Sequence, residues 1–168
     1  MQVFEAIKKR RSIRKFQPDK EISQKQVEKL LEAARWAPSA GNLQSYKLVI
    51  VREEKIKKEL AAQGFVSQAP VVFVACADGE LPASRYGQRG AELYAVQDAT
   101  LALYNLWFAA VEMDLGACWV GAFDEEKVTR VLELPSNLRP VAILPVGYPA
   151  KAPSPASRKS IEEVAKII

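Results

Sequence analysis

The sequence predicts an α+β fold in which helices surround one mixed sheet. The continuous apolar run 71–77 after Pro70 has the composition of a strand buried on both faces, and the run 140–149, closed by Pro149, is interpreted as the last central strand. Helical and strand patterns alternate irregularly around them, without an internal repeat or a linker. This order favours an α+β arrangement over a doubly wound parallel sheet. The 168 residues, 49% of them hydrophobic, suit one domain spanning residues 1–168 with a sizeable core.

Two helices are expected before the first strand. Apolar spacing predicts a short helix over about residues 2–9, which leads into a basic stretch. A second helix begins at the capping box 23–26, carries an apolar stripe on one face, and ends at Pro38. A loop of small and amide side chains, residues 37–45, follows, and its residue types suit close approach of the backbone to a ligand.

The middle of the chain predicts a strand over Tyr46–Val51 and a charged surface helix over Glu53–Ala62, with Lys57 exposed. After the buried strand 71–77, glycines and a proline punctuate residues 79–90. This segment is predicted either to be a mobile excursion over a site or to be an ordinary long surface loop.

Residues 92–115 form the longest candidate helix, and its apolar residues occur on nearly every side. Such a helix must be buried, which favours a subunit interface; the alternative is the central core helix of a monomer. A glycine-bracketed strand or turn, 116–123, comes next, and Asp124 is expected to cap a further helix. The chain ends in a proline-containing tail with a short amphipathic end.

Charge is distributed unevenly along the chain. Residues 1–60 contain 15 Lys and Arg against 8 Asp and Glu, a net charge of +7, whereas the remainder contains 9 against 12, a net charge of −3. Four of these cations, Arg10, Arg11, Arg14 and Lys15, flank Ser12. Guanidinium groups match phosphate oxygens two at a time, so this stretch is a candidate phosphate site; the alternative is a solvated charged surface.

Several classes of function are excluded or disfavoured by composition. The chain has no histidine, which excludes histidine-based acid–base catalysis and histidine-containing metal sites, and we expect no metal. Cys76 and Cys118 lie in apolar runs, as buried thiols of a reducing compartment do. No signal peptide or membrane-spanning run is present, so a cytoplasmic protein is expected. The basic segment lacks the aromatic patterns of nucleic-acid-binding modules, and no nucleic-acid partner is expected. Conventional catalytic side chains are also lacking, which indicates that a cofactor carries any reaction.

The order of five motifs resembles the nitroreductase family of flavoproteins, in its short single-domain form. The motifs are spread over almost the whole chain: Arg10-Arg11-Ser12-Ile13-Arg14-Lys15-Phe16, Ala37-Pro38-Ser39-Ala40-Gly41-Asn42-Leu43-Gln44, Tyr94-Ala95-Val96-Gln97-Asp98-Ala99, Gly116-Ala117-Cys118-Trp119-Val120-Gly121-Ala122-Phe123 and Arg158-Lys159. Each motif is weak alone, but the ordered set is fairly specific.

The resemblance implies a nitroreductase-like sandwich around a central mixed, mainly antiparallel sheet, completed as a homodimer that binds FMN between its subunits. It implies that the phosphate and ribityl chain of FMN contact Arg10, Arg11, Ser12 and Arg14, and that Arg158 and Lys159 close on the phosphate. Pro38, Ser39, Ala40 and Asn42 would reach the flavin from the other subunit, and Trp119, Val120 and Gly121 would approach its ring. Gln44 and Gln63 are additional candidates, and no side chain is expected to be catalytic.

The resemblance also implies a reaction. NADH or NADPH would pass hydride to the flavin, and a small electron-poor acceptor such as a nitroaromatic or a quinone would then be reduced in a ping-pong cycle. Relatives of this fold perform other flavin reactions, so the acceptor is not defined by the resemblance. The alternative is a flavin-binding protein of the same fold without turnover, for storage or sensing.

Overall fold

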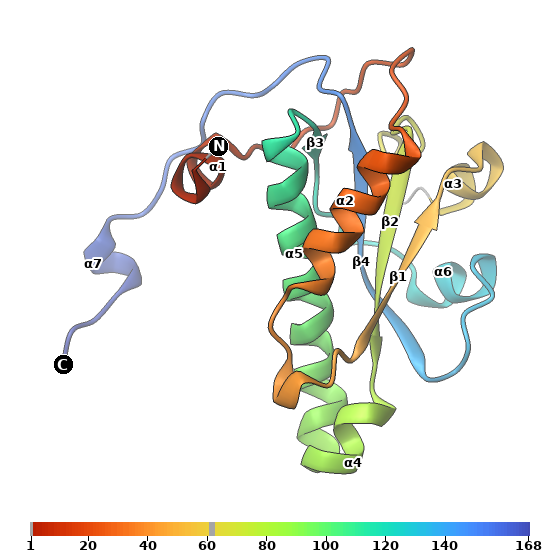
Figure 1. Cartoon of the computed structure of the whole chain (residues 1–168), viewed down its shortest axis with the longest axis vertical. Helices are drawn as coiled ribbons and strands as arrows, with labels where there is room; N and C mark the ends of the chain where they lie inside the picture. Colours follow the sequence, from red (N-terminus) through yellow and green to blue (C-terminus); the bar gives the residue numbers. More distant parts are fainter. Residues whose placement is uncertain (1, 61–62) are drawn as a thin grey trace.

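A four-stranded sheet with strand order β1-β2-β4-β3 lies at the centre of the protein, described here from a computed structural model (Figure 1). The structure describes residues 2–60 and 63–168. The strands are β1 (Tyr46–Val51), β2 (Val71–Asp78), β3 (Gly116–Ala117) and β4 (Leu138–Gly147). All three strand pairs are antiparallel, and the only parallel element among the described residues is an isolated bridge between Ser12 and Ala117. The expected mixed sheet is therefore almost wholly antiparallel.

Helices cover both faces of this sheet (Figure 1). The helices α2 (Gln24–Arg35) and α5 (Ala95–Glu112) pack on one face, and α3 (Glu54–Leu60) and α6 (Glu125–Val131) lie on the other. The central strand β2 is buried along nearly its whole length, as its continuous apolar sequence predicts. Alternate residues of β2 contribute to the two cores, Phe73 to the α2–α5 side and Val74 to the opposite side.

The N-terminal helix and the C-terminal tail lie at one side of this body. Helix α1 (Val3–Lys9) confirms the expected helix and exposes Val3 and Phe4. Residues 151–168 are exposed throughout, including the short helix α7 (Ile161–Val164). Figure 1 shows this tail running past α1 and away from the sheet.

The segment 79–90 differs from expectation, because most of it is helix α4 (Glu80–Arg89). Pro82 lies in the first turn, where a missing N–H costs no helical hydrogen bond. Gly87 has φ 61° and kinks the helix. A Cβ on Gly90 would lie 2.2 Å from the carbonyl oxygen of Pro82, so only glycine fits this contact. The chain then makes a π-helical turn, η2 (Gly90–Tyr94), before α5 begins.

Lys57 is a second difference from expectation. Its side chain lies under the turn before β2, where its Nζ donates to the carbonyl oxygen of Ala69 at 2.7 Å, and only 8% of the residue is exposed. Burial lowers the pKa of the Lys57 ammonium group. The sequence prediction of an exposed Lys57 is therefore wrong. The end of the predicted helix at Ala61 and Ala62 lies outside the described residues.

Candidate functional site

The basic stretch is fastened to the edge of the sheet at β3. Ser12 forms a parallel bridge with Ala117, and the N–H of Ile13 donates to the carbonyl oxygen of Ala117 at 2.9 Å. Further along, the N–H of Gln17 donates to the carbonyl oxygen of Tyr148 at 2.9 Å. These backbone bonds fasten the segment 12–17 beside β3 and the end of β4.

A groove of about 190 Å³ opens beside this stretch and carries only cationic, hydroxyl and apolar groups: it is lined by Ser12, Arg14, Lys15, Lys151 and Pro153. Within residues 2–60 and 63–168, neither Arg14 nor the neighbouring Arg10 pairs with a carboxylate. The cations of this groove are therefore available to an anion, and a guanidinium, two ammonium groups and a hydroxyl suit a phosphate. We call Arg10, Ser12, Arg14, Lys15 and Lys151 the basic half.

Aromatic rings hold the two arginines of the basic half in place. The guanidinium carbon of Arg10 lies 4.6 Å from the centroid of the Trp107 ring, and that of Arg14 lies 5.8 Å from the Phe65 ring. Phe65 belongs to the turn that also contains Gln63, so the structure brings this turn beside Arg14. The side chain of Gln63 is itself exposed.

Arg11 points to different partners. Its Nη1 donates to the carbonyl oxygens of Lys8 at 2.6 Å and Arg10 at 2.8 Å, at the C-terminal end of α1. It lines a separate groove with Lys9 and Asp114, whose side chains pair at 2.7 Å. The structure thus does not bring Arg11 together with Ser12 and Arg14.

The segment after β3 lies against the basic half. Val120 exchanges two backbone hydrogen bonds with Ile143 of β4, at 2.9 and 3.0 Å. Trp119 is half-buried, whereas Gly121 is exposed. Burial raises the pKa of the neighbouring Cys118 thiol, while the Arg14 guanidinium and a hydrogen bond with Ser12 act in the opposite direction. Cys118 therefore lies close to Ser12 and Arg14, and Trp119, Val120 and Gly121 follow it directly in the chain.

The tail cations stay apart from this site within one chain. Arg158 donates to the carbonyl oxygens of its own neighbours Ala156 and Ser157, and both Arg158 and Lys159 are exposed. No contact joins them to Ser12 or Arg14 in the described residues.

The predicted ligand loop, Pro38–Gln44, has an unusual backbone. Gly41, Asn42 and Gln44 have φ of 57°, 57° and 52°, in the left-handed region that residues other than glycine seldom adopt. The Ser39 hydroxyl oxygen accepts the N–H of Gln44 at 2.9 Å across the loop. Non-glycine residues in this region persist only where their surroundings hold them, and they concentrate at ligand-binding sites. We call Pro38–Gln44 the loop half.

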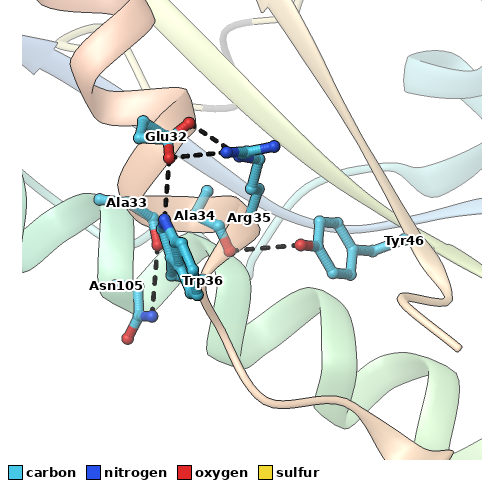
Figure 2. A network of polar contacts seen from close by, with 7 residues as sticks. All are labelled: Glu32, Ala33, Ala34, Arg35, Trp36, Tyr46 and Asn105. Carbon is cyan, nitrogen blue, oxygen red and sulfur yellow. Dashed lines mark hydrogen bonds and ion pairs between the residues drawn. The ribbon is translucent and has the colours of Figure 1, made fainter. Parts of the chain in front are cut away.

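The start of the loop half is fixed by the end of α2 (Figure 2). The carbonyl oxygen of Ala33 accepts from Nδ2 of Asn105 on α5 at 3.3 Å, and that of Ala34 accepts from the Tyr46 hydroxyl of β1 at 3.2 Å. Both carbonyls also accept backbone N–H groups, from Trp36 and Ala37, so the side-chain bonds add to the capping of the helix. They tie α2 to α5 and to β1, the strand that follows the loop.

The exposed indole of Trp36 is also held at this point. Glu32 forms a two-point contact with Arg35, at 2.7 and 2.8 Å, and accepts the Trp36 indole N–H at 2.8 Å (Figure 2). The hydrogen bond from Arg35 is the main reason that the pKa of Glu32 is lowered. Trp36 thus presents a fixed aromatic face just before the loop half.

Asp98 is a site residue that sequence reasoning did not single out, although it lies in one of the five motifs. It is only 2% exposed, and its two carboxylate oxygens accept the N–H groups of Ala40 at 3.0 Å and Ser45 at 3.4 Å. An acidic residue within a largely apolar helix was the available signal. Lys151 was also missed, because only the fold brings it beside Ser12.

The two halves lie at opposite ends of α5. Asp98 in the first turn contacts the loop half, whereas β3 and the basic half follow the C-terminal end of the helix. Glu112, the last residue of α5, lies 14 positions after Asp98, which corresponds to about 21 Å along the axis. Figure 1 shows the segment between α2 and β1 at the α4 end of α5, and α1 and β3 at the other end.

Comparison with known proteins decides the family. The model of the nitroreductase family matches residues 7–63 and 57–148, which is most of the chain. The chain belongs to the nitroreductase family. A protein of Methanothermobacter thermautotrophicus, named as an NADH dehydrogenase/NAD(P)H nitroreductase, is 35% identical over 161 residues, which cover 91% of this chain and 80% of the relative. The FMN reductase (NADPH) of Bacillus subtilis is 32% identical over 164 residues, covering 88% of this chain and 66% of the relative.

Solved structures confirm the fold. A nitroreductase family protein from Streptococcus pneumoniae has a TM-score of 0.90 and 27% identity, with 99% of this chain and 100% of that chain covered. The NADPH:FMN oxidoreductase of Vibrio harveyi, solved with NAD+, has a TM-score of 0.89 and 26% identity, with 98% of this chain and 76% of that chain covered. The nitroreductase α+β fold and oxidoreductase class expected from the five motifs are therefore confirmed.

Two other expectations concern metal sites and membrane-spanning helices. Among the described residues, no group of three or more potential metal ligands from His, Cys, Asp or Glu comes together. No helix in the described ranges has the length and apolar character needed to cross a membrane.

Proposed function

We propose that this nitroreductase family protein binds FMN and transfers hydride from NADH or NADPH to a small electron-poor acceptor, such as a nitroaromatic or a quinone, in a ping-pong cycle. The active form is a homodimer in which each FMN lies between the basic half of one subunit and the loop half of the other. The observation that carries this proposal is the separation of the two halves along α5 within one chain.

The residues of the basic half fit the phosphate of FMN. Phosphate monoesters are close to dianionic near neutral pH, and they are bound well by several cations together with a hydroxyl. Ser12, Arg14 and Lys151 line one groove that has no acidic group, and Arg10 lies beside it. In the dimer, Arg158 and Lys159 would add their charge from the exposed tail. Arg11 stays with the backbone of α1, so we assign it to shaping the end of that helix.

A second copy of the chain would complete the site. Leu101 is 41% exposed and Tyr104 is 40% exposed on the outer face of α5, and Phe108 beside them is half-buried. This strip lies near the middle of the helix. A two-fold axis close to Tyr104 would cover the strip with its own copy and place the N-terminal end of each α5 beside the C-terminal end of the other. The loop half of one subunit would then lie beside the basic half of its partner.

The chemistry needs little from side chains. When bound, FMN supplies the acceptance and donation of hydride, and no titratable group of the chain is required for that step. The chain's own residues bind the phosphate, and Trp119, Val120 and Gly121, next to Cys118, would orient the ring. Pro38, Ser39, Ala40, Asn42 and Gln44 would close the site from the other subunit and limit the access of water. Gln63 would border it through the turn that contacts Arg14.

The names of relatives support the donor and the cofactor. The Bacillus subtilis relative is an FMN reductase that uses NADPH, and the Vibrio harveyi structure is an NADPH:FMN oxidoreductase. Neither name defines the acceptor used by this chain. A cytoplasmic location remains a prediction from the sequence.

Titration of the apoprotein with FMN, followed by flavin fluorescence and sedimentation velocity, tests the proposal. We expect saturation at one FMN per chain and a dimer in the loaded state. A protein that stays colourless and leaves FMN fluorescence unchanged contradicts the proposal. A monomer that binds FMN contradicts the shared site alone.

A further inference from the structure

Within the described part of the chain, the buried carboxylate of Asp98 has only backbone hydrogen-bond partners. Its Oδ1 accepts from the N–H of Ala40, and its Oδ2 accepts from the N–H of Ser45. Among the described residues no cation pairs with it. A buried charge without a counter-charge is costly to desolvate, and the two backbone hydrogen bonds offset part of that cost.

The two donors lie on either side of the left-handed backbone of the loop half. Ala40 precedes Gly41, and Ser45 follows Gln44. Asp98 therefore joins the two ends of the strained segment to one rigid helix. The carbonyl oxygen of Ser45 also accepts the N–H of Asp78 at 3.0 Å, so the second end is held to β2 as well.

We propose that Asp98 is a positioning residue that clamps Ala40 and Ser45 so that the loop half has its FMN-binding shape before the cofactor arrives. The effect of Asp98 on FMN affinity rests on the proposed function, whereas its effect on the shape of the loop half does not. Holding a loop in its bound conformation removes an entropic cost from binding. The clamp therefore contributes to FMN affinity without touching the cofactor.

A carboxylate suits this task better than the amide of equal size. Both of its oxygens accept hydrogen bonds, whereas asparagine offers one oxygen and an NH₂ group. In Asp98→Asn, one of the two backbone N–H groups would face another donor and lose its partner. Hydrogen bonds to charged groups contribute about 1.5–3 kcal/mol, which corresponds to a loss of about ten- to a hundredfold in the population of the clamped loop.

The first test compares Asp98→Asn with Asp124→Asn in the full-length protein. Asp124 also accepts a backbone N–H, from Lys127 at 2.9 Å, but it caps α6 on the opposite face of the sheet. We expect amide hydrogen exchange at Ala40 and Ser45 to accelerate at least tenfold in apo Asp98→Asn, with β2 unchanged, and the FMN dissociation constant to rise at least tenfold. Asp124→Asn should leave the exchange rates at Ala40 and Ser45 and the FMN dissociation constant within about twofold of wild type.

The second test separates a local clamp from general damage to the chain. In a purified heterodimer of one Arg14→Ala chain and one Asp98→Asn chain, one shared site combines both changed halves and the other has two unchanged halves. We expect one of the two sites to bind FMN with wild-type affinity. If Asp98→Asn instead distorts its whole subunit, no site recovers and the positioning role is wrong.

The outcomes distinguish the two proposals. Unchanged exchange at Ala40 and Ser45 in Asp98→Asn overturns the clamp, whatever the protein binds. If wild type takes up no FMN, the proposed function is wrong and the exchange measurement still decides the clamp. Wild-type FMN affinity in a homodimer of Asp98→Asn contradicts the role of the clamp in binding.

Discussion

The guanidinium group of Arg10 stacks on the indole ring of Trp107, with 4.6 Å between the guanidinium carbon and the ring centroid. Trp107 is a buried residue of α5, and its indole N–H has no partner among the described residues. The stack fixes one cation of the basic half on the central helix. Because the ring occupies only a face of the guanidinium, the N–H edges of Arg10 remain available to an anion.

This stack predicts the effect of two substitutions at Trp107. Trp107→Leu removes the aromatic face and should raise the FMN dissociation constant about three- to tenfold, since cation–π contacts contribute about 0.5–2 kcal/mol. Trp107→Phe keeps an aromatic face, although a smaller one, and removes the unpaired N–H, so its dissociation constant should stay closer to that of wild type. Flavin fluorescence titration measures both. Equal losses of FMN affinity in the two variants would show that the volume of the side chain matters, and not its contact with Arg10.

Arg14→Ala should weaken FMN binding about ten- to a hundredfold, because charge-assisted hydrogen bonds to phosphate contribute about 1.5–3 kcal/mol each. Arg130→Ala is the matched control, since Arg130 is an exposed arginine of α6 with only a 4.0 Å pairing to Glu126. The same titration applies to both. Similar affinities in the two variants would remove Arg14 from the site. Lys57 is unsuitable as a control, because it is buried.

Gly41→Ala should distort the loop half. A Cβ at this position would lie 2.5 Å from the Tyr86 hydroxyl oxygen and 2.6 Å from Nη1 of Arg85, and the residue has φ of 57°. The left-handed backbone alone costs about 1–2 kcal/mol for an alanine. We expect weaker FMN binding and a lower unfolding midpoint.

Two other glycines separate the causes of that effect. Gly87 has φ 61° and ψ −151°, a conformation that almost only glycine adopts, but among the described residues no atom outside its own chain neighbours lies within 4 Å of the new Cβ. Gly64 has neither a positive φ nor such a contact. The unfolding midpoint should fall in Gly41→Ala and in Gly87→Ala and least in Gly64→Ala, whereas FMN binding should weaken most in Gly41→Ala. If Gly41→Ala and Gly87→Ala bind FMN equally well, distortion of the loop half is not the cause.

The buried thiol of Cys76 should make the stability of the folded state sensitive to alkaline pH. Burial raises the pKa of Cys76 from 9.0 to about 11. The folded state therefore holds the proton more tightly than the unfolded state does. This stabilisation is present below pH 9 and is lost as the pH rises from about 9 to about 11, by about 2–3 kcal/mol. Urea unfolding measures the free energy of unfolding at pH 8 and at pH 10.5. Its decrease between these two pH values should be smaller for Cys76→Ala than for wild type. Equal losses would mean that Cys76 does not control the alkaline sensitivity.

A charge on the outer face of α5 should separate the subunits. Leu101→Glu places a carboxylate in the exposed apolar strip beside Tyr104, where the proposed two-fold axis would bury it without a partner. Sedimentation velocity should show a monomer with weakened FMN binding. Ile50→Glu changes an equally apolar exposed residue of the edge strand β1 and should leave the dimer intact. A dimeric Leu101→Glu would place the interface elsewhere.

Local sequence patterns were sufficient to predict the elements that depend on contacts between residues close together in the sequence. The strand Tyr46–Val51 and the capping box at Ser23 appear as predicted, and Asp124 accepts the N–H of Lys127 as an N-cap should. Helix α4 was missed because its glycines and Pro82 are helix breakers on average. Here the proline falls in the first turn, and Gly90 is required by packing rather than by a loop.

The candidate site could be predicted only in its separate parts. The charges of the basic stretch and the small residues of the loop half are visible in the sequence, and the order of motifs indicates the family. The partners of Asp98 lie 53 and 58 residues away, and Lys57 is buried by a carbonyl twelve residues away. Such contacts depend on tertiary packing, which no local pattern contains.

The central claim is that the chain uses bound FMN to transfer hydride from a nicotinamide donor to an acceptor. Anaerobic titration of the FMN-loaded protein with NADH and with NADPH, followed by nitroaromatic and quinone acceptors, tests it most directly. We predict that at least one donor bleaches the flavin absorbance stoichiometrically and that an acceptor restores it. Flavin that stays oxidised with both donors would contradict the claim and leave a flavin-binding protein without turnover.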